Sequence, residues 1–213
     1  MAAVRAHGAD CPLDRNKGLE SMRKLLGMGA WLAIAATSAL AQDESMKAAV
    51  DECRRMAIRV TQELRDQLVK EMQLSGPLRS MVVCRYTCPE ILSRPSRKTG
   101  WRISAVSLKP RNSALGTPDE WEQRVLIDFE RRVAKGESAE GLEVAEIAVQ
   151  PQGRFLRFAR AIPVESMCLK CHGSRESLSE PVKAQLAIDY PFDEAVGYSK
   201  GQVYGILAIK RRF

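Results

Sequence analysis

Apolar residues recur at intervals of three and four along residues 45–74, with charged residues between them. This spacing predicts one long amphipathic helix with a single apolar stripe: Met46, Ala49, Val50, Cys53, Ala57, Val60, Leu64, Leu68 and Met72. Ser75-Gly76-Pro77 ends the pattern, and a shorter helix is predicted from Leu78 to about Arg85. Such a stripe is explained by packing on the core of the same domain, or by a homodimer contact through residues Ser45–Leu74.

Alternation replaces this periodicity in the second half of the chain. We predict a basic, turn-rich loop over Ser93–Gly100 and then a strand over Trp101–Leu108, which is rich in β-branched residues. Three further strands are predicted at Leu142–Val149, Phe155–Ile162 and Val203–Lys210, the first two joined as a hairpin across Gln150-Pro151-Gln152-Gly153.

Two helices are predicted between these strands. One begins with Thr117 as the N-cap and Pro118 in first position and ends near Gly136; the other covers Glu180–Ile188. A helix followed by mainly antiparallel strands with helices between them indicates an α+β fold with one antiparallel sheet, a long N-terminal helix and flanking helices.

Residues 22–41 have the composition of a secretory signal peptide. A short positive segment, Met22-Arg23-Lys24, precedes a mostly apolar run, and Ala39-Leu40-Ala41 fits a signal peptidase site. The run is shorter than the roughly 20 residues that a membrane span needs, so we expect cleavage and a periplasmic protein with no stable membrane span. Residues 1–41 are thus interpreted as a mis-assigned start plus the signal peptide Met22–Ala41, residues 42–76 as the helix, and residues 77–213 as the domain.

Charge excludes one class of partner. Residues 1–41 carry five basic and three acidic side chains, so their removal lowers the formal net charge from +7 to +5. The excess is modest and dispersed, unlike a nucleic-acid-binding face, and is compatible with an acidic redox partner.

The strongest candidate functional residues lie in the segment Cys168-Leu169-Lys170-Cys171-His172-Gly173. C-x-x-C-H is the attachment pattern of c-type haem: two thiols on one tight turn reach the two vinyl groups, and the following histidine binds iron. His172 is the only histidine after residue 41. A four-ligand zinc site would have to recruit Cys84 and Cys88, and a C-x-x-C redox pair needs no histidine after it. Lys109, Arg111 and Asn112 are candidates to bind haem propionates, the alternative being a solvated loop.

The sixth iron ligand is left open by the residues alone. Apart from His172 the candidates are Lys, an open site, Cys84, Cys88 and four methionines, Met46, Met56, Met72 and Met81, whose other explanation is core packing. Met167 adjoins the proximal motif and is poorly placed for the far face. Beyond the motif, the thiols Cys53, Cys84 and Cys88 are an odd number, so one disulfide plus one sulfur with another role is the simplest account, with Cys53–Cys88 one conjectured pairing.

Several segments together resemble a known family. They are Gly100-Trp101 with its strand, Ser107–Asn112, Pro118–Glu122, Arg160–Pro163, the Cys168–Gly173 motif, Tyr190-Pro191 and Gly197–Gly201. The chain resembles the exported monohaem c-type proteins with a PAS-like fold, known from cyanobacteria and as sensor domains of histidine kinases, and is similar to their stand-alone form. The resemblance implies a PAS-like haem c domain over residues 77–213. It also implies a cysteine upstream of an Ala-Pro pair as the distal ligand, a position matched by Cys84, with Cys88 standing in place of the alanine before Pro89.

Three function classes follow. The first is a periplasmic monohaem cytochrome acting as a redox- or ligand-responsive domain or low-potential electron carrier, with a redox partner or receptor that the sequence does not identify. The second is a peroxidase-like enzyme or gas-binding protein with an open distal site; an enzyme of this kind commonly needs a second histidine as acid–base group, which residues 42–213 lack. The third is an interaction module that dimerises through the long helix. We expect the first, and no enzyme.

Overall fold

The computed structural model describes the backbone of residues 16–213 and the side chains of residues 43–213. The predicted signal peptide, Met22–Ala41, lies outside the residues whose side chains are described. In the described part of the chain, no helix is both long and apolar enough to cross a membrane. The chain divides into two compact units, Met1–Lys47 and Ala48–Phe213, and the second holds the sheet and the candidate site.

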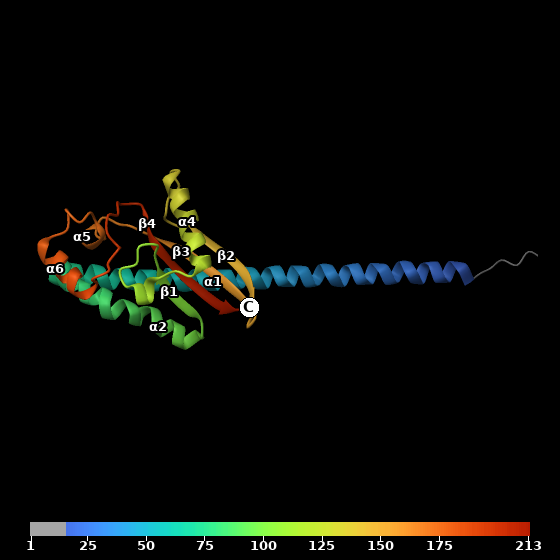
Figure 1. The fold of residues 1–213 in the computed structure, drawn as a ribbon. Helices are drawn as coiled ribbons and strands as arrows, with labels where there is room; N and C mark the ends of the chain where they lie inside the picture. The colour runs from blue at the N-terminus through green and yellow to red at the C-terminus, as the bar shows by residue number, and fades with distance from the viewer. Residues whose placement is uncertain (1–15) are drawn as a thin grey trace, which may run out of the picture. The chain divides into compact units, whose positions relative to one another are not determined.

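Six α-helices, one π-helical turn and four strands make up the described chain (Figure 1). The helices are α1 (Asn16–Val82), α2 (Cys88–Thr99), α3 (Ser113–Gly116), α4 (Glu120–Ala134), α5 (Leu169–His172) and α6 (Glu180–Asp189), and the π turn η1 covers Val83–Thr87. The strands are β1 (Arg102–Val106), β2 (Glu143–Gln150), β3 (Gly153–Pro163) and β4 (Val203–Arg212). They form one antiparallel sheet in the order β1-β4-β3-β2, which confirms the predicted α+β class.

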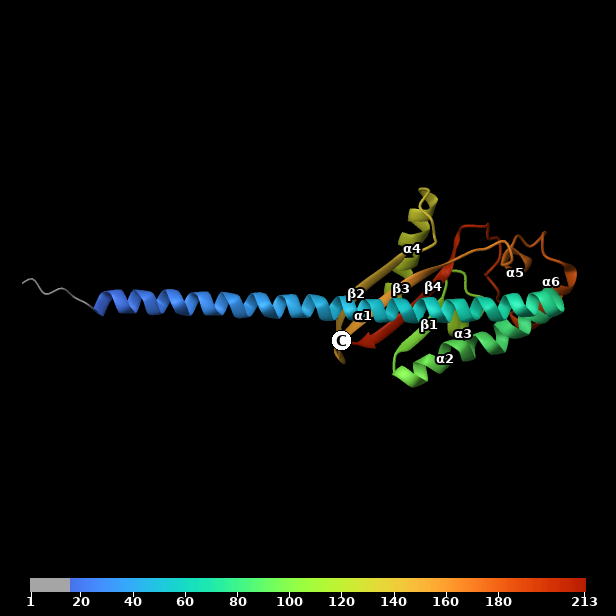
Figure 2. The same cartoon turned by 180° about the vertical axis from the view of Figure 1, so that it is seen from behind.

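A glycine divides the long helix. Gly76 has φ 74° and ψ −179°, a left-handed φ that residues with a Cβ rarely adopt, and Pro77 restarts the helix directly after it. The end that the sequence predicted at Ser75-Gly76-Pro77 therefore coincides with this break. After the break the chain turns, and α2 lies beside α1 in both views (Figures 1 and 2).

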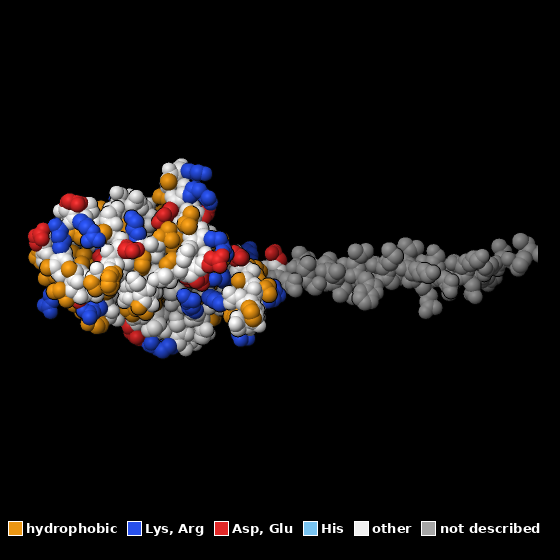
Figure 3. All heavy atoms as spheres, in the orientation of Figure 1, with side chains coloured by type: hydrophobic (Ala, Val, Ile, Leu, Met, Phe, Trp, Pro, Cys, Tyr) orange, Lys and Arg blue, Asp and Glu red, His pale blue; other side chains and the backbone are white. Residues whose placement is uncertain are grey.

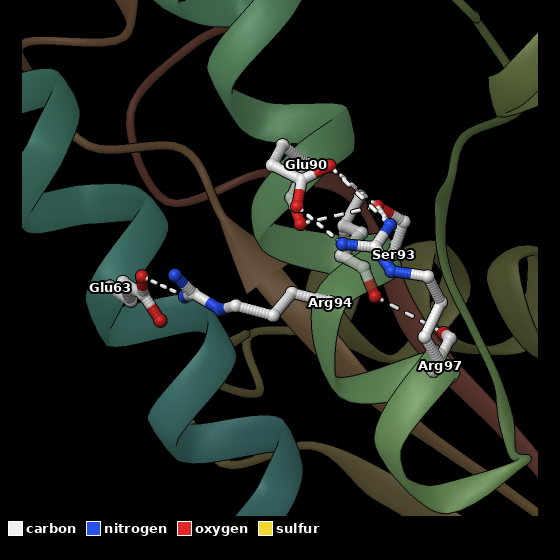
Figure 4. Close-up of polar contacts among 7 residues, drawn as sticks. Glu63, Glu90, Ser93, Arg94 and Arg97 are labelled. Carbon is white, nitrogen blue, oxygen red and sulfur yellow. Dashed lines mark hydrogen bonds and ion pairs between the residues drawn. The ribbon is translucent and has the colours of Figure 1, made fainter.

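The predicted loop at Ser93–Gly100 is wrong, because α2 continues to Thr99. Three contacts explain how a segment with a proline, Pro95, stays helical. Arg94 forms an ion pair with Glu63 of α1, and Arg97 reaches back to Glu90 and Ser93 (Figure 4). Local composition favoured a loop, but contacts within α2, the buried Ile91 and the Arg94–Glu63 pair with α1 stabilise the helix.

The two faces of the sheet are covered by different helices. On one face, α4 packs its apolar side on the sheet in a cluster that includes Trp121, Leu126, Phe129, Ala159 and Ile206. On the other face lies α1, whose residues Glu52 and Arg54 pair with Arg211 of β4 and Glu143 of β2 (Figure 2). The stripe residues Ala49, Cys53, Ala57 and Val60 are buried, which confirms that this part of the predicted stripe packs on its own domain.

The start of α4 differs from the prediction by two residues. Asp119, rather than Thr117, is the N-cap: its side chain accepts from the Glu122 amide at 3.0 Å, and the Glu122 carboxylate accepts from the Asp119 amide at 2.8 Å. Arg157 of β3 donates to Asp119 at 2.6 Å, so the same carboxylate fixes α4 to the sheet. Thr117 Oγ1 donates instead to the Ser113 carbonyl.

Charges are mixed over the visible face of the second unit. Figure 3 shows Lys and Arg side chains interspersed with Asp and Glu, without one large block of a single sign. This distribution agrees with the dispersed charge expected from the sequence.

Candidate haem site

The C-x-x-C-H motif forms one helical turn after β3. The Cys168 carbonyl accepts from the Cys171 amide at 3.1 Å and from the His172 amide at 2.9 Å, and the Leu169 carbonyl accepts from the Gly173 amide at 3.0 Å. The turn therefore carries both thiols and the imidazole within five residues. A side chain at Gly173 would not fit, because its Cβ would lie 2.6 Å from the Leu169 carbonyl oxygen.

The imidazole of His172 has a defined orientation. Its Nδ1 lies 2.7 Å from the carbonyl oxygen of Ala195. A carbonyl can only accept, so Nδ1 must carry the proton and Nε2 keeps a free lone pair. Burial, with the charge of Arg111, lowers the pKa of His172 to about 3, so the ring is neutral at ordinary pH. A neutral imidazole whose Nδ1–H is held by a carbonyl is the usual state of a histidine that binds metal.

Two tyrosines of the C-terminal segment surround this ring. The ring of Tyr204, on β4, packs edge-on against the His172 ring with centroids 4.7 Å apart. The centroid of the Tyr198 ring lies 5.6 Å from that of Tyr204. The Tyr198 amide also donates to the His172 carbonyl at 3.0 Å. Loop and strand thus fix both the backbone and the ring of His172.

Arg111 connects the motif to the loop that faces it. Its Nη2 donates to the Cys171 carbonyl at 2.6 Å and to the Ala195 carbonyl at 3.2 Å, and it pairs with Asp193 at 3.1 Å. Arg111 and Asp193 have only 8% and 7% of their side chains exposed, so this is a buried ion pair. The carbonyl that holds His172 Nδ1 is therefore held in turn by Arg111.

Cys84 and Cys88 lie on the π turn and the first residue of α2. Pro89 has no amide proton and its ring crowds the carbonyl four residues earlier, which explains a widened turn at this position. The Cys88 amide accordingly donates to the carbonyl of Val83, five residues back. Hydrogen bonding from the Cys88 thiol lowers the pKa of Cys84 to about 7, with a further contribution from the charge of Arg111.

This segment faces the motif. Met81 packs in one cluster with three residues on or near α6, Leu178, Val182 and Leu186, and with Cys171 and Tyr190 around it. Arg85 pairs with Asp189 at the end of α6. Burial raises the pKa of Cys171 to about 11, and the charge of Arg111 opposes this shift. The segment that carries Cys84 therefore lies beside the predicted haem motif.

The remaining thiol is remote from these. Cys53 is fully buried on α1, where burial raises its pKa to about 11 and Arg211 opposes the shift. The conjectured Cys53–Cys88 disulfide is wrong, because both cysteines are free and none of the five described cysteines is bonded to another.

The three predicted propionate ligands have different surroundings. Arg111 is engaged as described above, the Lys109 ammonium lies 5.1 Å from the centre of the Tyr198 ring, and Asn112 Oδ1 accepts from the Ala114 amide at 3.1 Å as the N-cap of α3. Propionate binding stays a prediction for each. Sequence reasoning missed Ala195 and Asp193; the contribution of Ala195 is a backbone carbonyl, which no side-chain pattern reveals.

A protein-family model and a solved structure are similar to this chain. A model of the Tll0287-like family matches residues 40–211. The chain belongs to the Tll0287-like family. It is similar in fold to a solved structure, titled "Crystal structure of the cyanobacterial heme-protein Tll0287", with a TM-score of 0.59 and 18% sequence identity over 78% of this chain and 95% of that one. A search of curated proteins gives no match. These findings confirm the resemblance stated from the sequence, including the PAS-like α+β fold.

Proposed function

We propose that this protein is a haem protein of the periplasm that acts as a redox-responsive domain or a low-potential electron carrier. In this proposal Cys168 and Cys171 attach one haem covalently and His172 is the proximal ligand. The observation that carries it is the bond from His172 Nδ1–H to the Ala195 carbonyl, on the same turn as the two thiols. The solved structure of similar fold, titled as a heme-protein, supports haem as the cofactor.

The residues present fit such a group. Cys168 and Cys171 are free thiols, and Nε2 of the neutral His172 ring has its lone pair available. The surroundings are largely apolar or aromatic, as a haem face requires: Met81, Leu178, Val182, Leu186 and Tyr190 pack near Cys171, while Val164, Tyr198 and Tyr204 lie near Cys168. Covalent attachment would use the two thiols and leave the imidazole for the iron.

Cys84 is our assignment for the distal ligand. It is the cysteine with the lowered pKa, about 7, so its thiolate forms more readily than an ordinary one. Arg111 contributes to that shift from the side of the motif. Met81 is the methionine that the fold places next to this region, but it is buried in the cluster with α6. An anionic thiolate favours ferric iron and would give a low potential.

Haem would supply one-electron chemistry at the site, and the chain's own residues would set its conditions. His172 and Cys84 would bind the iron, Arg111 would hold the Cys171 and Ala195 carbonyls beside His172, and the apolar cluster would limit water. Residues 42–213 contain no second histidine to move protons at an open distal side. This residue set supports electron transfer or sensing over peroxidase-type catalysis.

The test is an optical and EPR comparison of the haem-loaded wild type with Cys84→Ser, Cys88→Ser and Met81→Leu. We expect a low-spin ferric spectrum with thiolate character that is lost in Cys84→Ser and retained in Cys88→Ser and Met81→Leu. Retention of haem on a denaturing gel tests the covalent bonds, and it should disappear in Cys168→Ala/Cys171→Ala.

Two results would contradict the proposal. A high-spin, five-coordinate iron that reacts with peroxide or binds gases would favour the alternative of an open distal site. Absence of covalently attached haem from wild type expressed in an export-competent host would refute c-type attachment itself.

A further inference from the structure

Cys84 and Cys88 are a pair of reduced thiols about one helical turn apart beside the candidate site. Neither is in a disulfide, both are partly buried, and they lie four positions apart across the π turn and the first residue of α2. No part of the proposed function uses Cys88. A second thiol about one helical turn from the proposed ligand is therefore an unexplained feature of this chain.

The backbone brings the two residues within range of a covalent bond. Positions i and i+4 of a regular helix have Cα atoms about 6 Å apart, from a rise of 1.5 Å per residue and a radius of about 2.3 Å. Disulfides accept Cα separations of roughly 4.4–6.8 Å. The Cβ atoms of such a pair are about 5–6 Å apart, more than the ~4 Å of a disulfide, so bond formation requires a local shift of the backbone.

The π turn is the place where such a shift is easiest. The Cys88 N–H donates to Val83 O, five residues back, and Pro89 contributes no amide proton. On its outer side Tyr86 is 62% exposed, so little packing opposes rearrangement. A disulfide that must distort its helix is less stable than a relaxed one and is readily reduced again.

We infer that Cys84 and Cys88 form a reversible dithiol–disulfide switch, in which oxidation withdraws Cys84 from the distal position. The bond consumes the sulfur that would bind iron, and the accompanying shift moves residue 84. The part of this inference that concerns iron rests on the proposed function; formation of the disulfide does not.

The step balances by exchange with a small-molecule disulfide such as oxidised glutathione. The thiolate of Cys84 attacks one glutathione sulfur and releases one glutathione thiol, giving a mixed disulfide. The Cys88 sulfur then attacks Cys84 Sγ and releases the second. Overall, two protein thiols and one disulfide give one protein disulfide and two glutathione thiols, so two electrons pass from protein to glutathione.

The test uses the haem-loaded full protein equilibrated in a series of glutathione redox buffers. Each sample is divided for spectroscopy and for alkylation of free thiols followed by tryptic mass analysis. Cleavage after Arg85 separates the two cysteines, so a disulfide links peptide 80–85 to peptide 86–97 and is read directly. We expect this linked peptide to appear and the low-spin thiolate signal to decline with the same midpoint, both reversed by excess reduced glutathione.

Two variants complete the design. Cys88→Ala should keep the thiolate signal at glutathione ratios where the wild type has lost at least half of it. Cys53→Ala, which removes a buried thiol remote from the pair, should follow the wild type.

Failure of the switch and failure of the proposed function give different results. If Cys84→Ser abolishes the thiolate signal but no linked peptide forms at any glutathione ratio, the switch is refuted and the ligand assignment stands. If the linked peptide forms and the spectrum does not change, withdrawal of a ligand is refuted together with the assignment of Cys84.

Discussion

At the scale of single residues, Arg111 is the side chain outside the motif that holds the most parts of the candidate site in place. One guanidinium reaches the backbone of the motif at Cys171, the carbonyl that orients His172, and the carboxylate of Asp193. Removing it would leave Asp193 buried without its charge partner. Such a loss is more costly than the pair is stabilising, because the remaining charge is desolvated and uncompensated.

Arg111→Gln should therefore lower the free energy of unfolding by about 3–5 kcal/mol, measured by urea denaturation followed by circular dichroism. Arg111→Gln/Asp193→Asn should recover part of the loss, because no unpaired charge is then buried. The matched control is Arg175→Gln, since Arg175 is exposed and contacts Asp193 only through its backbone carbonyl. Equal destabilisation in the single and double variants would show that the ion pair is not the cause.

Gly173→Ala gives a second test at this scale. The added Cβ would meet the Leu169 carbonyl oxygen at 2.6 Å, and backbone cannot move aside as a side chain can. We expect the turn that carries Cys168 and His172 to open and the yield of covalently attached haem to fall several-fold, read as in-gel haem stain per unit of protein. In Gly116→Ala the added Cβ would meet the Pro110 Cβ at 3.4 Å and the Ala105 carbonyl oxygen at 4.0 Å, so this variant should retain the wild-type yield. A wild-type yield in Gly173→Ala would mean that the turn is not rigid.

Residue patterns predicted the side of this site formed by the C-x-x-C-H motif better than the side formed by the segments that face it. Cys168, Cys171 and His172 are adjacent in sequence, and their chemistry specifies their spacing. Ala195 contributes only a carbonyl. Arg111, in the loop after β1, is recognised as a positioning residue only once that loop, the α5 turn and the 190–197 loop are placed together. These contacts span up to 84 residues of sequence, so no local pattern contains them.

At the scale of elements, capping and turn chemistry explain both the successes and the errors of prediction. Gly76 with Pro77 gave a correct helix break because the required backbone conformation is local. The start of α4 was misplaced because Thr117, Asp119 and Pro118 all suit a helix N-terminus. Asp119 is the cap because its carboxylate also binds Arg157 of β3, a contact that the sequence does not show.

Asp119 should also make stability depend on pH. Burial acts to raise its pKa, but the bonds from Arg157 and the Glu122 amide, with the charges of Arg157 and Arg102, outweigh it and hold the pKa below its usual value. A carboxyl whose pKa is depressed by folding stabilises the protein above the unfolded pKa, and this contribution is lost as pH falls through the folded value. The wild type should therefore lose stability below about pH 4.

Two substitutions of Asp119 distinguish its role as the helix N-cap from the effect of its negative charge. Asp119→Asn keeps a good N-cap and should flatten the acid dependence of the unfolding midpoint, whereas Asp119→Ala should also lose about 1 kcal/mol at neutral pH. Glu120→Gln, with a side chain 91% exposed, is the control and should match the wild type. An acid dependence in Asp119→Asn as steep as that of the wild type would assign the effect to other carboxylates.

At the scale of the whole molecule, the sequence predicted the apolar stripe of the long helix but not the surface it meets. Periodicity shows that one side is apolar, and either the sheet or a second copy of the chain satisfies it equally well. The structure lays Cys53, Ala57 and Val60 on the sheet face opposite α4, and the Arg211–Glu52 and Arg54–Glu143 pairs fix the helix there. That burial leaves less apolar surface for the homodimer considered from the sequence.

We therefore expect the haem-loaded protein to have the mass of one chain by light scattering at two concentrations tenfold apart. Ala57→Glu would bury a carboxylate between α1 and the sheet, where residue 57 is fully buried, and should destabilise the fold by several kcal/mol. Ala48→Glu, on the exposed side of the same helix, should change neither mass nor unfolding midpoint. If instead the wild type has twice the mass and Ala57→Glu halves it without lowering the unfolding midpoint, the stripe is a dimer face. Because an intramolecular contact affects stability and an intermolecular contact affects mass, the pair of measurements assigns the helix to its own sheet or to a second chain.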